Sequence, residues 1–138
     1  MKKLIYFILV AVALSSCDCK NGYGPSNCKE TWASKYAGNW IANVNCSGQV
    51  TEAQGNISEE SPTSIIIDNE IIAELNDWDS FSIPSQQLNG STITGIGGIK
   101  ETTNHANGGV IISSYYVWFN ITVTANNQTT ICTSNYTR

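Results

Sequence analysis

From residue 40 onward, apolar and polar side chains alternate along the chain, and this pattern predicts β-strands. Residues 40–46 place Trp40, Ala42, Val44 and Cys46 on one side, with asparagines between them. A period of two residues is typical of a strand with one buried face. Residues 110–124 carry the longest such pattern, and we expect its odd positions to face inward. These apolar positions are Ile111, Tyr115, Val117, Phe119, Ile121 and Val123.

Turn-forming residues divide the rest of this region into further short apolar segments. The expected segments are residues 50–58, 64–68, 70–75, 81–84, 91–96 and 129–136. Asn, Asp and Gly between them indicate turns. We expect tight turns at residues 68–69 and 126–127, a break or bulge at residues 97–98 and a hairpin loop at residues 102–109. Roughly eight strands at spacings of about ten residues indicate an all-β fold, either a single antiparallel barrel or a β-sandwich.

A helical pattern is confined to the segment before the first strand, residues 29–36. Trp32 and Tyr36 stand four positions apart there, so one face of a short helical turn can carry both rings. Gly38 follows as a stop. We expect this turn to cover one end of the core.

The first residues of the chain follow a different pattern. Lys2 and Lys3 precede an uncharged apolar run over residues 4–14, and the sequence Leu-Ser-Ser-Cys follows at residues 14–17. A permanent membrane span needs about 20 apolar residues, so this run is too short for one. The pattern indicates a secretory signal peptide.

The sequence at residues 14–17 resembles the lipobox of bacterial lipoproteins. The resemblance implies that the chain is cut before Cys17 and that the Cys17 sulfur is lipidated. It divides the chain into a signal peptide at residues 1–16, a lipidated tether at residues 17–28 and a β domain at residues 29–138. Residues 1–16 are expected to form an apolar helix that projects from the domain. The implied partner is a membrane, which places the protein in the bacterial cell envelope, on the periplasmic or surface face of the outer membrane.

Removal of the signal peptide changes the charge of the chain. Without Lys2 and Lys3, five of the seven basic residues remain against eleven acidic ones, a formal charge of −6. This charge argues against nucleic acid as a partner, because nucleic-acid binding needs a basic surface. The remaining 122 of 138 residues correspond to one domain.

Four cysteines remain when Cys17 is reserved for lipid. An exported protein meets an oxidising compartment, so we expect disulfides, and four cysteines allow three pairings. We favour Cys19–Cys28, which closes a loop with two glycines, and Cys46–Cys132, which ties the first core strand to the last. A zinc site is the alternative, but the chain has no CxxC spacing and a single histidine, His105. We expect no metal and no cofactor.

Gly38-Asn39-Trp40, just before the first strand, resembles the G-x-W signature of lipocalin-like barrels. The resemblance implies that Trp40 closes one end of the barrel beneath the helical turn, packed under Trp32 or Tyr36. Together with the lipobox, the small β domain is also similar to small exported lipoproteins of unknown function. Neither resemblance implies a particular ligand.

Aromatic side chains are the best candidates for binding, because they stack on sugars and line apolar pockets. We single out Trp78, Tyr116 and Trp118, the last two on the face of their strand opposite the apolar set. Asp77 and Asp79 beside Trp78 could bind calcium, although a solvated acidic turn is the favoured interpretation.

We expect a membrane-anchored protein that binds a ligand or serves a structural role without catalysis. The partner is an unknown small molecule, glycan or protein. One alternative is a small glycoside or ester hydrolase that uses a pair of carboxylates. The other is an inhibitor or immunity-type lipoprotein that covers a partner protein with an exposed aromatic patch.

Overall fold

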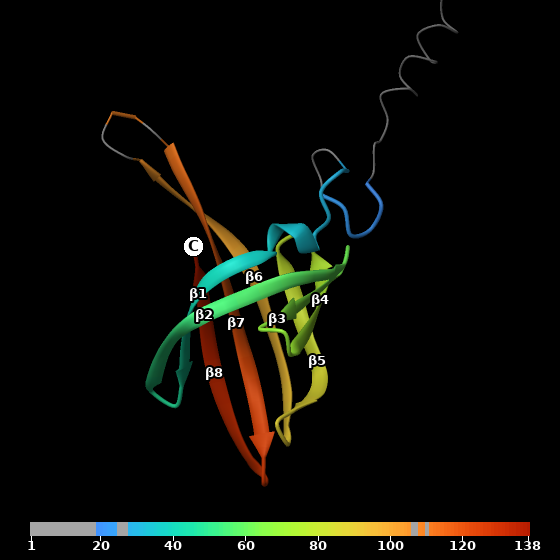
Figure 1. Cartoon of the computed structure of the whole chain (residues 1–138), viewed down its shortest axis with the longest axis vertical. Helices are drawn as coiled ribbons and strands as arrows, with labels where there is room; N and C mark the ends of the chain where they lie inside the picture. The colour runs from blue at the N-terminus through green and yellow to red at the C-terminus, as the bar shows by residue number, and fades with distance from the viewer. Residues whose placement is uncertain (1–18, 25–27, 106–107, 110) are drawn as a thin grey trace, which may run out of the picture.

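The chain folds into a closed antiparallel barrel of eight strands, each paired with the next in sequence and the last with the first (Figure 1). The computed structural model describes residues 19–24, 28–105, 108–109 and 111–138, apart from the side chains of residues 111 and 112. The strands are β1 (Gly38–Cys46), β2 (Gln49–Ser61), β3 (Ser64–Ile67), β4 (Ile71–Asp77), β5 (Ser80–Leu88), β6 (Ser91–His105), β7 (Ile111–Ala125) and β8 (Gln128–Thr137). The predicted all-β fold is confirmed, and of the two architectures the barrel is found. This architecture is consistent with the lipocalin-like resemblance.

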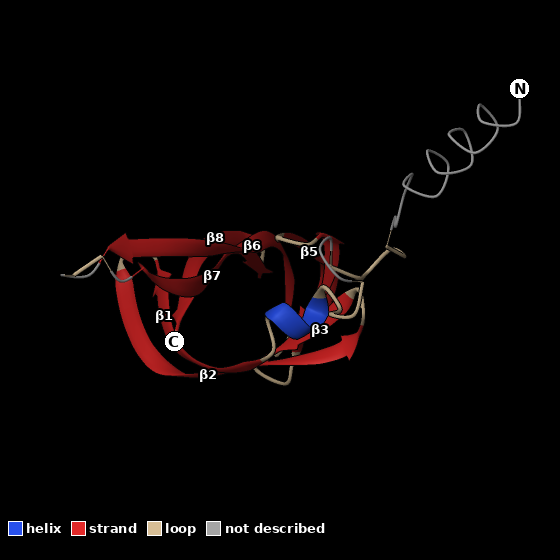
Figure 2. Cartoon of the chain, turned by 90° about the horizontal axis from the view of Figure 1, so that it is seen from above, coloured by secondary structure: helices blue, strands red, loops and turns tan. Residues whose placement is uncertain are grey.

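The two ends of the barrel differ. At one end, which we call the closed end, the 3-10 helix η1 (Ala33–Lys35) lies at the rim of the ring of strands (Figure 2). At the other end, the open end, tight turns join β1 to β2, β3 to β4, β5 to β6 and β7 to β8. The predicted turns at residues 68–69 and 126–127 are confirmed, and all four of these residues have positive φ. At residues 126–127 these angles suit the two-residue hairpin turn from β7 to β8, because its twist matches that of the strands. The β3–β4 connection is one residue longer and includes Glu70.

The core occupies the barrel from the closed end to its middle. Val117, Phe119 and Ile121 of β7 are buried as predicted, and Tyr115 and Val123 pack against the core. The side chain of Ile111 lies outside the described residues. A series of aromatic rings runs through the interior, with centroid separations of 5.6 Å from Tyr36 to Phe81 and 6.2 Å from Phe81 to Phe119.

Trp40 closes one end of the barrel, as the G-x-W resemblance implies. It is 1% exposed, and its Nε1 donates a hydrogen bond of 2.9 Å to the carbonyl oxygen of Tyr36. Tyr36 follows directly on η1, so the helical turn sits over the indole. Burial, aided by the nearby Asp79 carboxylate, raises the pKa of Tyr36.

The glycines at residues 97–98 do not interrupt the sheet, so the predicted break there is wrong. β6 runs without a register shift against β7, and the predicted loop at residues 102–109 is instead strand as far as His105. A Cβ at Gly97 would lie 2.4 Å from Phe81 Cζ and 2.5 Å from Phe119 Cβ. Gly97 is therefore needed for the packing of core rings against β6. The irregularity lies in β5, between Ile83 and Gln86.

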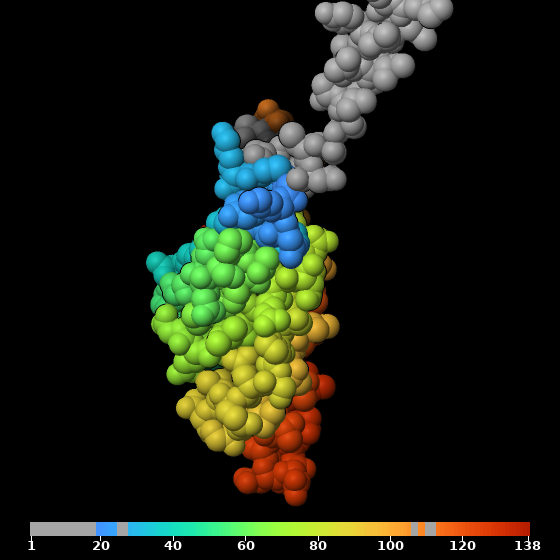
Figure 3. All heavy atoms as spheres, turned by 90° about the vertical axis from the view of Figure 1, so that its right-hand side faces the viewer, coloured from blue at the N-terminus to red at the C-terminus, as the bar shows by residue number. Residues whose placement is uncertain are grey.

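Both predicted disulfides, Cys19–Cys28 and Cys46–Cys132, are present. Part of the segment assigned to a tether, residues 19–24, packs against the closed end of the barrel (Figure 3). The Trp32 backbone N–H donates to Gly22 O at 2.7 Å, and the Trp32 indole N–H donates to Tyr23 O at 2.9 Å. No helix in the described part of the chain has the length and apolar character to cross a bilayer. Residues 1–16 and Cys17 lie outside the described residues.

Candidate ligand-binding site

The open end of the barrel contains an apolar cavity of about 180 Å³, which we call the cup. Inward-facing side chains from six strands and from the β3–β4 turn line it. Its apolar wall consists of Val44, Ile71, Leu88, Ile93, Ile121 and Val123. These residues come from the alternating strand pattern, which directs one side chain in two into the barrel. The cavity therefore occupies the part of the interior that the core side chains do not fill.

On one side of the barrel, strand pairing is short toward the open end. β3 has four residues and pairs with β2 from Ile57 to Ser61, so Gln49–Gly55 of β2 pairs with β1 alone. Next to β4, Pro84 interrupts the pairing of β5 because proline has no amide N–H to donate. The Gln86 side chain bridges this place, and its Nε2 donates to Ile72 O at 2.7 Å while its Oε1 accepts from Ile72 N at 3.0 Å.

Two aromatic rings separate the cup from the core. Phe119 and Tyr136 are each 2% exposed, and their ring centroids lie 5.1 Å apart. The Tyr136 ring extends from β8 across the barrel toward β2, where Gly55 leaves room for it. A Cβ at Gly55 would lie 2.6 Å from Tyr136 Cε2.

Of the described residues that line the cup, one is charged: Asp68, an exposed residue of the β3–β4 turn. The Tyr136 hydroxyl donates a short hydrogen bond to Asp68 Oδ2, and the Asn56 backbone N–H donates to Asp68 Oδ1 at 2.8 Å. The backbone N–H of Asp68 in turn donates to Asn56 O at 2.7 Å. Asp68 is thus held in one orientation by groups from β2 and β8. Burial and the hydrogen bond to Asp68 raise the pKa of the Tyr136 hydroxyl, which remains a donor.

The Cys46–Cys132 disulfide also lines the cup. The two cysteines are register partners across β1 and β8, the pair of strands at which the barrel closes, and their Cα atoms lie 4.3 Å apart. The sequence predicted this bond but did not predict that it faces a cavity. Ser134 lies two positions after Cys132 on the same face of β8, is 3% exposed and also lines the cup.

Trp78, one of the predicted binding residues, lies at the opposite end of the barrel. It lines a polar hollow of about 410 Å³ with Lys35, Glu101, Tyr115 and Arg138 among its neighbours. The Lys35 ammonium lies 4.7 Å from the Trp78 ring centroid and 5.9 Å from that of Tyr115, which is within the range of cation–π attraction. Burial lowers the pKa of Lys35, against the opposing effect of the Asp79 and Glu101 carboxylates. Lys35 of the protein itself therefore covers the Trp78 ring.

Tyr116 and Trp118, the other two predicted binding residues, lie on the outer wall of the barrel and are half-buried. The Lys100 ammonium is 5.7 Å from the Trp118 ring centroid. Trp118 pairs with Gly98 on β6, where a Cβ would lie 3.4 Å from Trp118 Nε1 but only 2.4 Å from Asp79 O. The structure thus brings Tyr116 and Trp118 together but separates both from the cup.

Arg138 completes the closed end and was not predicted as a functional or structural residue. Its guanidinium lies 4.1 Å from the Trp40 ring centroid and donates to Ala37 O at 3.2 Å and to Lys35 O at 3.4 Å. These contacts fasten the end of β8 to the segment around η1. The sequence gives no signal for this arrangement, because Arg138 lies about 100 residues from its partners.

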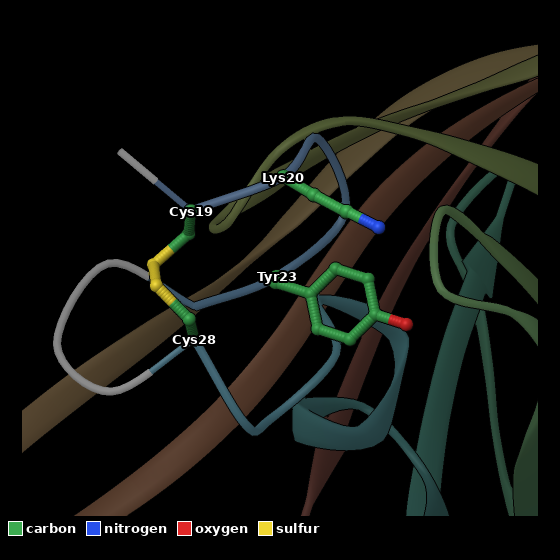
Figure 4. A pocket seen from close by; sticks show the side chains of 4 residues that line it. All are labelled: Cys19, Lys20, Tyr23 and Cys28. Carbon is green, nitrogen blue, oxygen red and sulfur yellow. A yellow bond between two sulfur atoms is a disulfide. The ribbon is translucent and has the colours of Figure 1, made fainter. Parts of the chain in front are cut away.

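A third hollow, of about 390 Å³, lies beside the N-terminal disulfide (Figure 4). Cys19, Lys20, Tyr23 and Cys28 line it, and the side chains of Lys20 and Tyr23 project away from the disulfide (Figure 4). It contains none of the aromatic residues predicted to bind.

The acidic residues around Trp78 form a turn. Asp77 Oδ1 accepts a hydrogen bond of 2.6 Å from the Trp78 backbone N–H. Within the described ranges of the chain, no three His, Cys, Asp or Glu side chains are grouped as metal ligands would be. Comparison of the chain with protein-family models, with curated proteins and with solved structures found no match.

Proposed function

We propose that the protein is a non-enzymatic binding module that takes a small, mainly apolar molecule into the cup. The cup itself is the observation that carries this proposal. It is an apolar recess inside a closed sheet, with one oriented polar pair at its side, and ligand sites commonly combine an apolar lining with a few placed polar groups. An engineered apolar cavity of about 150 Å³ in another protein binds benzene, so a volume of about 180 Å³ suits a molecule of one ring with a short substituent.

We also propose that lipid on Cys17 anchors the barrel to a membrane, as the lipobox resemblance implies. The support is the short distance along the chain from Cys17 to the packed N-terminal segment. Two residues span at most about 7 Å, so an anchor at Cys17 would hold the closed end beside the bilayer. The cup, at the other end, would then face away from the membrane.

The test of ligand binding uses benzyl alcohol as the probe and amide chemical shifts as the readout. We expect shifts to concentrate around the cup, at positions such as Ile93, Val123 and Cys132. Val123→Trp places a large side chain in the cup and should abolish them. Thr124→Trp, one residue along on the outward-facing side of the same strand, is the matched control and should leave them unchanged. Shifts confined to the closed end, or unaffected by Val123→Trp, would refute the proposed site.

The test of the anchor is separate. Cys17→Ser should leave an unprocessed precursor without a lipid label, whereas Cys19→Ser should still be processed. Normal cleavage and labelling of the Cys17 variant would contradict the lipoprotein proposal. Robust hydrolysis of a glycan or ester, lost on changing one acidic pair, would replace the binding proposal with the hydrolase alternative.

A further inference from the structure

The basic residues of the described chain are confined to one half of the barrel. Its five basic residues all lie in or beside the closed half, and they are Lys20, Lys29, Lys35, Lys100 and Arg138. Lys100 pairs with Tyr116 and Tyr116 with Thr137, which places Lys100 level with the end of β8 where Arg138 follows. Acidic side chains occur in both halves, and most of them lie toward the closed end. The open half contains Glu52, Asp68 and Glu70, all exposed, and no basic side chain among the described residues.

No basic side chain is found among the described residues that line the cup. Among the described residues that line it, Asp68 is the one with a charged side chain. Each Asp68 oxygen accepts one hydrogen bond, from Asn56 N–H and from the Tyr136 hydroxyl. Both donors are neutral, so they orient the carboxylate without cancelling its charge. A carboxylate oxygen accepts about two hydrogen bonds, so Asp68 retains acceptor capacity toward a ligand.

From this arrangement we infer that the cup selects small apolar molecules that carry an amine, and that it rejects carboxylates of the same shape. This inference rests on the proposed ligand site. An ammonium group beside Asp68 forms a charge-assisted hydrogen bond, which is stronger than a neutral one. A ligand carboxylate at the same place would meet a like charge, with the basic side chains at the far end of the barrel. The negative side chain excludes the wrong ligand as well as attracting the right one, and specificity commonly requires both.

The positions of Asp68 and the apolar lining also predict the orientation of the ligand in the cup. The ring would fill the apolar part of the cup, above Phe119, and the amine would point toward the β3–β4 turn. Because Tyr136 spans from β8 to Asp68, loss of its hydroxyl would free the carboxylate to rotate. Tyr136 is accordingly a positioning residue for Asp68.

The experiment compares three probes of one shape on the full chain in mild detergent at pH 7. They are benzylamine, a cation at this pH, benzyl alcohol, which is neutral, and benzoate, an anion. We expect benzylamine to bind at least tenfold more tightly than benzoate, which corresponds to about 1.4 kcal/mol. Benzyl alcohol should lie between the two. Added salt should narrow the difference, because Asp68 lies partly in solvent.

Two matched variants assign the selectivity to Asp68. Asp68→Asn keeps an oxygen acceptor, and asparagine tolerates the positive φ of 52° at this position. It should reduce the preference for benzylamine to less than threefold. Glu70→Gln removes an exposed charge two residues further along the chain and should leave the preference unchanged.

The outcomes separate this inference from the proposed site. If none of the three probes binds, or if Val123→Trp does not affect their binding, the proposed function fails. If Val123→Trp abolishes binding but benzoate binds within threefold of benzylamine, the cup stands and the amine selectivity is refuted. An unchanged preference in Asp68→Asn would also refute it.

Discussion

The two disulfides provide a quantitative test of how the barrel is stabilised. Cys46–Cys132 joins residues 86 positions apart, and Cys19–Cys28 joins residues 9 positions apart. In the chain-entropy model, a cross-link restricts the unfolded chain more when it closes a longer loop. The model gives about 4.6 kcal/mol for the long loop and about 2.6 kcal/mol for the short one. The difference, about 2 kcal/mol, depends only on the ratio of loop lengths.

We therefore compare two double variants with the parent chain, all lacking the signal peptide. One combines Cys46→Ala with Cys132→Ala, and the other combines Cys19→Ala with Cys28→Ala. Urea unfolding followed by tryptophan fluorescence gives the free energy of unfolding of each. The first variant should lose about 2 kcal/mol more free energy of unfolding than the second, from the difference in loop length. A small further loss is expected for the first variant, because Cys132 is buried and its sulfur packs in the cup wall.

A result that the short-loop variant loses as much stability as the long-loop variant, or more, would refute the reasoning. It would mean that contacts in the folded state, such as the packing of residues 19–24 on the closed end, outweigh the restriction of the unfolded chain. Reduction of the parent chain should reproduce the sum of the two losses, and this serves as the control for effects of the substitutions themselves.

Three further predictions address the interior and the closed end. Arg138→Ala should lower the free energy of unfolding by about 1–3 kcal/mol, because the stacking on Trp40 and the hydrogen bonds of the guanidinium are lost. Arg138→Lys should restore less than half of this loss in urea unfolding, because an ammonium group cannot both stack on the indole and bridge two carbonyl oxygens. Gly55→Ala should lower the free energy of unfolding by about 1–3 kcal/mol, because the added Cβ overlaps the Tyr136 ring. If the variant is as stable as the parent chain in thermal unfolding, the ring moves aside without an energetic cost. The free energy of unfolding should fall as the pH rises above about 10, the ordinary pKa of tyrosine. Burial raises the pKa of Tyr36 and Tyr136 in the folded state, so these two tyrosines ionise in the unfolded chain first and thereby favour unfolding. Each tyrosine adds a slope of about 1.4 kcal/mol per pH unit, so Tyr136→Phe should make the measured decline shallower, and an unchanged slope would contradict this.

Local patterns in the sequence predicted most of the fold. The alternation in residues 40–46 and 110–124 became β1 and β7, and the asparagine-bearing turns formed where expected. Tyr136 shares a strand face with Cys132, so its inward direction was available from the same pattern. The strand lengths were less accessible, because a segment such as residues 81–84 extends into a nine-residue strand through pairing with its neighbours, and that pairing depends on other parts of the chain.

The site was less predictable than the fold. The sequence analysis predicted Trp78, Tyr116 and Trp118 as binding residues because they are aromatic. In the structure, Lys35 covers Trp78, and the other two side chains lie on the outer wall of the barrel. The cup depends on Asp68 and Tyr136, which are 68 positions apart and meet across the barrel. Composition alone does not distinguish Asp68 from the other acidic residues in turns.

By itself, the sequence determined the class of fold, the inward face of β1 and β7, the turns at residues 68–69 and 126–127 and the two disulfides. These features follow from the period of two, from residues that accept turn angles and from the oxidising compartment that the N-terminal pattern indicates. The tertiary structure decided that the sheet closes into a barrel, that its basic residues gather at one end and that Asp68, an exposed turn residue, lines an apolar cavity at the other. Those features arise from strand register and from contacts between distant segments. Side-chain periodicity states which face a residue occupies, but it does not state which residues lie opposite one another inside a closed sheet.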